Sequence, residues 1–313
     1  MSFLGKFFSS FVTLARQPIE SFIRLETADD SITMVAEDGS LVSYLRIDGS
    51  RQIIGQEEYQ HILEAATVKL GSRFDRPGHA LQVFFSRNPA RARATTEKEI
   101  YPSKVTARNI GLEVEDVLDE RARHLARYMI HEECYFVLWT RPNILPPNDL
   151  KRAVGEQRDK KWVAAFSAQN PNAAIEPIKA RHRSYVSGIQ SALDELGVRS
   201  EIMGTHDSMA AVRNNLFPDL ANERWKPILP GDKIPTRAPE SKGDYSEILW
   251  PPLRQQLTAA DGEIINNRIV KIGALLWGGV DMTLAPSDPS PFPMLLNRLF
   301  EANIPYRICF LIE

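Results

Sequence analysis

The chain has 313 residues, with 38 Lys and Arg against 40 Asp and Glu, which gives a formal net charge of −2 at pH 7. Hydrophobic residues make up 43% and charged residues 25%, so the composition excludes a disordered chain, a collagen-like repeat and a disulfide-stapled miniprotein. The near-neutral charge argues against a protein that coats nucleic acid, because phosphate binding draws on an excess of Lys and Arg.

The first residues predict an amphipathic helix. Its large apolar residues recur at helical spacing with polar residues between them: Phe3, Leu4, Phe7, Phe8, Phe11 and Leu14. Two interpretations stay open: the helix packs on its own domain, or its apolar face enters a membrane surface or a groove on a partner. No run of about 18 apolar residues occurs, so we expect no membrane-spanning helix.

Residues 31–54 predict a β-meander. Ser31–Ala36 and Leu41–Ile47 are rich in strand-forming residues, and the Asp-Gly pair between them is a strong hairpin signal. A second Asp-Gly pair leads to Arg51–Ile54. The spacing of apolar residues then predicts a helix over Gln56–Leu70, followed by a strand over Ala80–Phe85.

Residues 86–108 are polar and basic. Five cations stand out as a contact for nucleic acid or acidic lipid: Arg87, Arg91, Arg93, Lys104 and Arg108. Only Tyr101 is available to stack on bases, so a solvated loop with weak ion pairs is the favoured interpretation. A helix over about Leu112–His131 follows, with acidic residues before basic ones in the order that suits the helix dipole. It leads to a buried strand over Cys134–Thr140.

The second half alternates helices with turn-rich segments. Asn148–Phe166, Ile178–Leu196 and Met209–Leu216 predict helices, the last with Asp207 or Ser208 as its N-cap. Residues 226–252 are rich in proline and predict a long exposed loop. The remaining predictions are a strand pair within Asn267–Leu284, a helix around Phe292–Ala302 and a strand over Tyr306–Ile312.

These elements predict an α+β fold, with a mixed or antiparallel sheet and amphipathic helices on one face. The expected divisions are an N-terminal amphipathic helix (1–24), an α/β subdomain (25–140), a helical segment (141–225), the Pro-rich loop (226–252) and a closing segment (253–313). The two cysteines, Cys134 and Cys309, lie in apolar runs, which favours reduced, buried thiols and a cytoplasmic setting.

Motifs of catalysis are missing from the sequence. There is no phosphate-binding Gly-x-x-x-x-Gly-Lys-[Ser/Thr] loop, no Gly-x-Gly-x-x-Gly and no His-Glu-x-x-His. His124 and His131 lie two turns apart on one predicted helix, a spacing that seldom serves a metal ion. The stretch Gly204–Ser208 contains nucleophile, base and acid types, but neighbours in sequence rarely converge as a triad. We therefore assign no catalytic, cofactor or metal residues and expect the chain neither to bind nor to hydrolyse ATP.

One stretch resembles a known family. Residues 25–49, with Gly55-Gln-Glu-Glu-Tyr59 and Phe74-Asp-Arg-Pro-Gly-His-Ala-Leu-Gln-Val-Phe-Phe-Ser-Arg87, are similar to the start of the DotO/IcmB ATPases of type IVB secretion systems, whose conjugative relatives are TraU-type. The likeness is most specific over about residues 15–90. Over 110–140 and at the end it is looser and resembles the wider VirB-type ATPases.

The resemblance implies a cytoplasmic ATPase at the bacterial inner membrane, whose N-terminal domain contacts the membrane apparatus. ATP and Mg²⁺ would then bind only in a following ATPase domain, since no position here matches that family's nucleotide site. The expected role is docking and oligomerisation. The expected partners are other inner-membrane and ATPase components, further copies of the chain and, peripherally, the membrane through the N-terminal helix. The alternative is a nucleic-acid-binding accessory of a conjugation system that uses the five cations.

Overall fold

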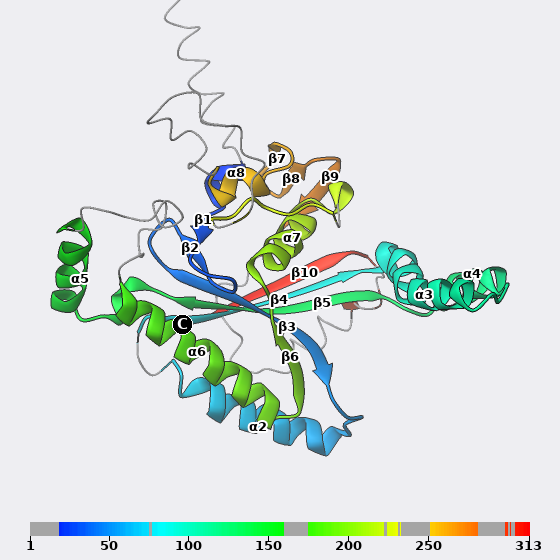
Figure 1. The fold of residues 1–313 in the computed structure, drawn as a ribbon, viewed down its shortest axis with the longest axis horizontal. Coiled ribbons are helices and arrows are strands. Elements are labelled where there is room, and N and C mark those ends of the chain that lie inside the picture. The colour runs from blue at the N-terminus through cyan, green and yellow to red at the C-terminus, as the bar shows by residue number, and fades with distance from the viewer. Residues whose placement is uncertain are drawn as a thin grey trace, which may run out of the picture.

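The structure is a computed structural model that describes residues 19–74, 77–159, 175–221, 224–230, 232, 251–280, 298–299, 301 and 304–313. A seven-stranded antiparallel sheet forms its centre, with strand order β1-β2-β3-β5-β4-β10 and β6 paired to β3 (Figure 1). The strands are β1 (Leu25–Ala28), β2 (Met34–Ala36), β3 (Leu41–Ser50), β4 (His79–Asn88), β5 (His131–Thr140), β6 (Val198–Ile202) and β10 (Tyr306–Ile312). The predicted α+β class and antiparallel sheet are confirmed.

Helices and a small second sheet surround this centre. The α-helices are α2 (Gln56–Gly71), α3 (Ala92–Asn109), α4 (Glu115–Leu125), α5 (Pro147–Asp159), α6 (Glu176–Glu195), α7 (Thr205–Leu216) and α8 (Leu253–Leu257). Short 3₁₀ turns are η1 (Ile19–Phe22), η2 (Pro89–Arg91), η3 (Pro142–Ile144) and η5 (Pro218–Leu220). The second, antiparallel sheet contains β7 (Gly262–Asn266), β8 (Ile269–Ile272) and β9 (Leu275–Gly278).

Over β3 and β5 both faces of the central sheet are covered, so the prediction of helices on one face is wrong. Alternate residues of β3 point to opposite sides: Leu45 packs with α6, whereas Val42 packs with α7 and α8. Leu138 and Val137 on β5 divide in the same way. In Figure 1, α2 and α6 lie on one side of the sheet, and α7, α8 and the small sheet on the other. Burial on both faces explains why these strands are continuous apolar runs.

The predicted meander is right for its first hairpin and wrong for its third strand. β2 and β3 pair antiparallel across the Asp-Gly turn, as expected. The second Asp-Gly pair makes no turn: β3 runs through it to Ser50, and Gly49, with φ +103°, forms a bulge against β6. Glycine takes this φ without steric cost, so the strand bends and continues. Arg51–Ile54 is therefore no strand.

Other boundaries move for local reasons. The helix predicted over Leu112–His131 is shorter, because its last residues form a turn and the start of β5. α7 begins at Thr205 with Gly204 as its N-cap, so the prediction of Asp207 or Ser208 in that position is wrong. The strand pair within residues 267–284 corresponds to β8 and β9, while β1, β6, β7 and α8 were not predicted. Most of the Pro-rich loop, most of the predicted helix around residues 292–302 and the end of the helix over 148–166 lie outside the described residues.

Candidate functional site

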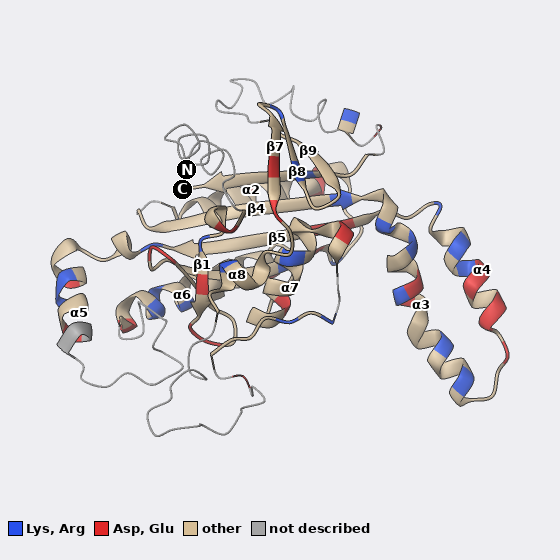
Figure 2. Cartoon of the chain, turned by 90° about the horizontal axis from the view of Figure 1, so that it is seen from above, with Lys and Arg blue, Asp and Glu red and all other residues tan. Residues whose placement is uncertain are grey.

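A two-helix hairpin projects from one end of the central sheet. The chain leaves β4 through η2, forms α3, turns at residues 110–114 and returns through α4 to β5. Figures 1 and 2 show the two helices side by side and extending away from the rest of the molecule. We call residues 89–130 the arm. It includes most of the segment that was predicted to be a solvated loop with weak ion pairs, so the loop is wrong, whereas the ion pairs are present.

Small side chains explain why the arm is helical and slender. On α3 the buried residues are Ala92, Thr96, Ile100 and Ala107, and on α4 the buried residue is Ala122. Alanine has the highest helix propensity, and alanines between two helices allow their backbones to approach closely. Pro102 lies inside α3, where its carbonyl accepts a hydrogen bond from the Thr106 hydroxyl at 3.0 Å. The arm thus contains little apolar core of its own.

Four of the five cations that were predicted as a basic contact form ion pairs with carboxylates. Lys104 pairs with Asp119 and Arg108 with Glu115, both across the two helices. Hydrogen bonds from these cations lower the pKa of both carboxyl groups. The other pairs are Arg93 with Glu97 at 2.8 Å and Arg87 with Glu132 at 2.8 Å. The fifth cation, Arg91, ends η2, near enough to Glu133 to lower the pKa of that carboxyl group.

Hydrogen bonds fix the base of the arm to the body. The Thr95 hydroxyl lies 2.9 Å from His131 Nδ1, which joins α3 to the start of β5. His131 Nε2 lies 3.3 Å from Glu133, and Asn215 on α7 donates a 3.0 Å hydrogen bond to the same carboxylate. Burial raises the pKa of Glu133, but the contact with His131, the hydrogen bond from Asn215 and the charge of Arg91 together leave the pKa lower than usual. The arm is therefore attached firmly where it meets the sheet.

The free end of the arm presents apolar side chains to solvent. Gly111, with φ +72°, ends α3, and the Leu112 amide donates to the Ala107 carbonyl at 2.9 Å, as in a Schellman cap. Ile110 is 65% exposed, Leu112 52% and Val117 59%. We call these three residues the tip. Close spacing of large exposed apolar residues is typical of a protein-contact surface rather than of a solvated turn.

The tip was not among the predicted sites. Leu112 and Val117 lie within the helix predicted over Leu112–His131, and no contact was predicted at either residue or at Ile110. The signal was present in the sequence: two large apolar residues flank a glycine between two strongly polar helices. Apolar residues at such a turn either pack against the helices or stay exposed, and the sequence alone does not distinguish the two arrangements.

The predicted membrane or partner contact at Phe3, Leu4, Phe7, Phe8, Phe11 and Leu14 lies outside the described residues. Within the part of the chain that is described, no helix combines the length and the apolar character that crossing a bilayer requires.

The residue groups considered for chemistry do not assemble within the described chain. His124 packs against Tyr128 with ring centroids 5.3 Å apart, while His131 takes part in the base of the arm. Ser208 is buried and donates to the Gly204 carbonyl, whereas His206 pairs with Asp232 at 2.8 Å. Both cysteines are free, but the prediction that both are buried is wrong, because Cys134 is half-buried and Cys309, on the edge strand β10, is exposed. Burial raises the pKa of the Cys134 thiol to about 11. Among the described residues, no cluster of three His, Cys, Asp or Glu side chains fits a metal ion.

Neither the models of known protein families nor the curated proteins include a match to this chain.

Proposed function

We propose that the chain is a docking and oligomerisation domain of a DotO/IcmB-like ATPase from a type IVB secretion or conjugative-transfer system. The observation that carries the proposal is the arm, a firmly based helical hairpin whose exposed tip is apolar. A hairpin that adds little to the core and extends apolar residues into solvent suits the binding of another protein. The resemblance over residues 15–90 supplies the system in which that partner would be found.

The ion pairs of the arm weigh against the nucleic-acid alternative. Four of its five proposed cations already face carboxylates, so phosphate binding would have to displace those partners. The carboxylates would also repel the phosphate backbone. Docking through apolar residues requires no such exchange.

A substitution at the tip tests the proposal. In the full protein, expressed in cells that carry its transfer system, Ile110→Ser, Leu112→Ser and Val117→Ser together should reduce co-isolation with inner-membrane components at least about tenfold. Loss of a few buried apolar contacts costs several kcal/mol of binding, which exceeds a tenfold change. Sedimentation of the purified chain, with and without the substitutions, measures self-association in parallel.

The matched control replaces three apolar residues of α2. Tyr59, Leu63 and Val68 are between 47% and 74% exposed, so their change to Ser removes a comparable apolar surface at a different place. Co-isolation should persist in this control. If the tip variant keeps both its partners and its self-association, or if the control loses them equally, docking through the arm is wrong.

A further inference from the structure

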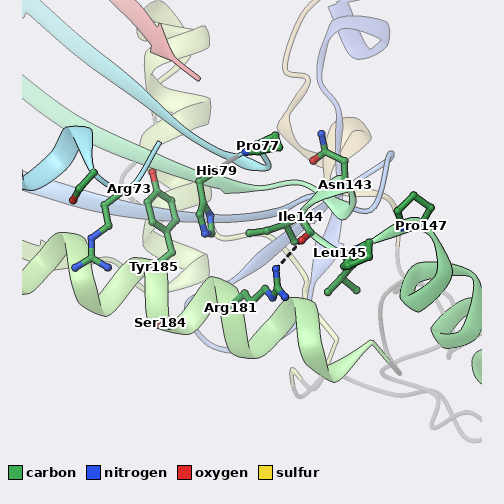
Figure 3. Close-up of a pocket in the computed structure, with 12 residues that line it drawn as sticks. Arg73, Pro77, His79, Asn143, Ile144, Leu145, Pro147, Arg181, Ser184 and Tyr185 are labelled. Atoms are coloured by element: carbon green, nitrogen blue, oxygen red, sulfur yellow. Dashed lines mark hydrogen bonds between the residues drawn. The ribbon is translucent and has the colours of Figure 1, made fainter. Parts of the chain in front are cut away.

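A pocket lies at the opposite end of the central sheet from the arm. Its volume is about 840 Å³, and it lies between the end of α2, the start of β4, η3 and α6. Figure 3 shows side chains from all four segments around it. Arg181, Ser184 and Tyr185 line it from α6, with the spacing of neighbours on one helix face, so the pocket extends along that face.

Aromatic and apolar side chains form most of the lining. His79 stacks on Tyr185 with ring centroids 4.1 Å apart. The apolar residues come from the chain just before β4 and from η3 and its surroundings: Pro77, Ile144, Leu145, Pro146 and Pro147. A concave surface of this kind suits apolar side chains of another protein.

Two arginines contribute positive charge at separate places along this pocket. Arg181 Nη1 donates to the Ile144 carbonyl at 2.7 Å, whereas the Arg73 guanidinium rests against Gly188 (Figure 3). Gly188 follows Arg181 by about two turns of α6, or roughly 10 Å, so the two guanidinium groups call for two separate anionic groups. Among the described residues neither arginine has an ion-pair partner, and those that line the pocket include no Asp or Glu.

The end of the arm carries the opposite charge. Glu113 and Asp116 lie beside the tip residues, both are exposed, and neither forms an ion pair within the part of the chain that is described. They line one hollow with Leu112, so acidic and apolar groups face the same side. Arg108 and Glu115, which line the same hollow, pair with each other. Two carboxylates beside apolar side chains complement two guanidinium groups beside an apolar wall.

The tip and the pocket of one molecule cannot meet. β4 and β5 pair from His79 with Thr140 at the pocket to Asn88 with His131 at the arm, a span of about 30 Å. The 18 residues of α3 then extend about 27 Å farther. In Figure 1 the arm and α5 lie at opposite ends of the sheet. Contact between the two surfaces therefore requires two molecules.

We propose that the tip of one chain docks in the pocket of a second copy, so that chains associate head to tail. This inference rests on the proposed docking role of the arm and identifies its partner. The apolar tip residues pack against the apolar wall of the pocket, and Glu113 and Asp116 pair with Arg73 and Arg181. Because the two surfaces differ, each chain keeps one of them available for a further copy, and the assembly is a ring or a filament.

Charge reversal, followed by sedimentation velocity of the purified full chain, tests the head-to-tail contact. Glu113→Lys with Asp116→Lys reverses the tip, and Arg73→Glu with Arg181→Glu reverses the pocket. Each double variant alone should self-associate at least about tenfold more weakly, because like charges then face each other. An equimolar mixture of the two should associate again, since each tip then meets a pocket of opposite charge. Recovery in the mixture also shows that both variants are folded.

Two control variants reverse charges close to these surfaces but outside them. Arg183→Glu changes an exposed residue of α6 that lies 3.8 Å from Asp30, and Glu99→Lys changes an exposed residue of α3. Both should self-associate as the original chain does. An original chain that stays monomeric at every accessible concentration overturns the inference. So does a mixture that fails to associate, or a loss in the controls equal to that in the charge-reversed variants.

The head-to-tail contact and the proposed function fail in different ways. If the tip variant with three serines loses its inner-membrane partners while the pocket variant self-associates normally, the arm docks elsewhere and only the head-to-tail contact is wrong. If the tip variant keeps both its inner-membrane partners and its self-association, both proposals are wrong.

Discussion

His182 is a titratable side chain enclosed between α6 and the sheet. Its two ring nitrogens lie 2.9 Å from the Thr140 and Ser43 hydroxyls, and Ser43 in turn donates to the Ile32 carbonyl at 2.9 Å. Because the Ser43 hydroxyl donates its hydrogen to Ile32, it can only accept from His182, so Nε2 carries the ring hydrogen. Nδ1 then accepts from the Thr140 hydroxyl, and the neutral ring satisfies both partners. If Nδ1 were protonated, the Thr140 hydroxyl would have to accept from it instead of donating to it. The site therefore favours the neutral form.

This preference predicts acid sensitivity. Burial lowers the pKa of His182 to about 4, against about 6.5 in the unfolded chain. The unfolded state therefore binds more protons between these values, and the free energy of unfolding should fall as the pH drops from about 6.5 to 4, by up to about 3 kcal/mol. Urea unfolding at a series of pH values measures this fall.

The variant His182→Gln should be less stable at pH 7 and should show a flatter pH dependence. The control His61→Gln replaces an exposed histidine of α2 and should keep the original slope. A steep slope that persists unchanged without His182 would show that other groups cause the acid sensitivity.

At the scale of elements, the arm shows what periodicity predicts and what it misses. The pattern of α4 predicted the correct element type, but α3, which packs against it, buries mainly alanine and threonine, with Ile100 as its one large buried residue. The sequence of α3 was interpreted as a loop because its cations stood out. Its buried residues at positions 92, 96 and 100 keep helical spacing but are mostly small, so they gave a weak hydrophobic signal.

The slender contact between the helices predicts a local response to overpacking. Ala122 is 1% exposed, so Ala122→Leu should force α3 and α4 apart at a cost of about 1–3 kcal/mol. Hydrogen exchange should then speed up across the arm while β3, β4 and β5 stay protected, because the arm lies outside the core of the sheet.

Ala94→Leu is the matched control, since Ala94 is exposed on the same hairpin. It should leave exchange in the arm unchanged. Faster exchange throughout the sheet in Ala122→Leu would mean that the arm and the body unfold as one unit.

At the scale of the whole molecule, strands from distant parts of the chain complete the sheet. β6 follows α6 and pairs with β3, and β10 pairs with β4 in a register that joins Tyr306 to Arg87. The predicted segments 25–140, 141–225 and 253–313 thus all contribute strands to one sheet. Local pattern located β10 correctly but carried no information on its partner, because strand pairing depends on long-range contacts. The pocket between the end of α2, the start of β4, η3 and α6 has the same origin, because four segments from distant parts of the chain form it.

The position of β10 at the edge of the sheet predicts the effect of its removal. Deletion of residues 304–313 leaves β4 paired with β5 on one side only, and the open edge on its other side promotes association between chains. Size-exclusion chromatography should show aggregates of the shortened chain. Phe310→Ser with Ile312→Ser keeps the backbone pairing, so this variant should elute as the original does. A shortened chain that behaves like the original would contradict this role for β10.

The register of β4 and β5 has a consequence for the arm. The two strands pair along their whole length, from His79 with Thr140 to Asn88 with His131, so the chain departs and re-enters at directly opposed residues. A two-residue hairpin turn bridges such a gap in antiparallel strands. The arm is thus an insertion into a β-hairpin that is already complete. The arm could therefore be replaced by a short turn without disturbing the pairing of β4 and β5, and a different hairpin could be inserted at the same place.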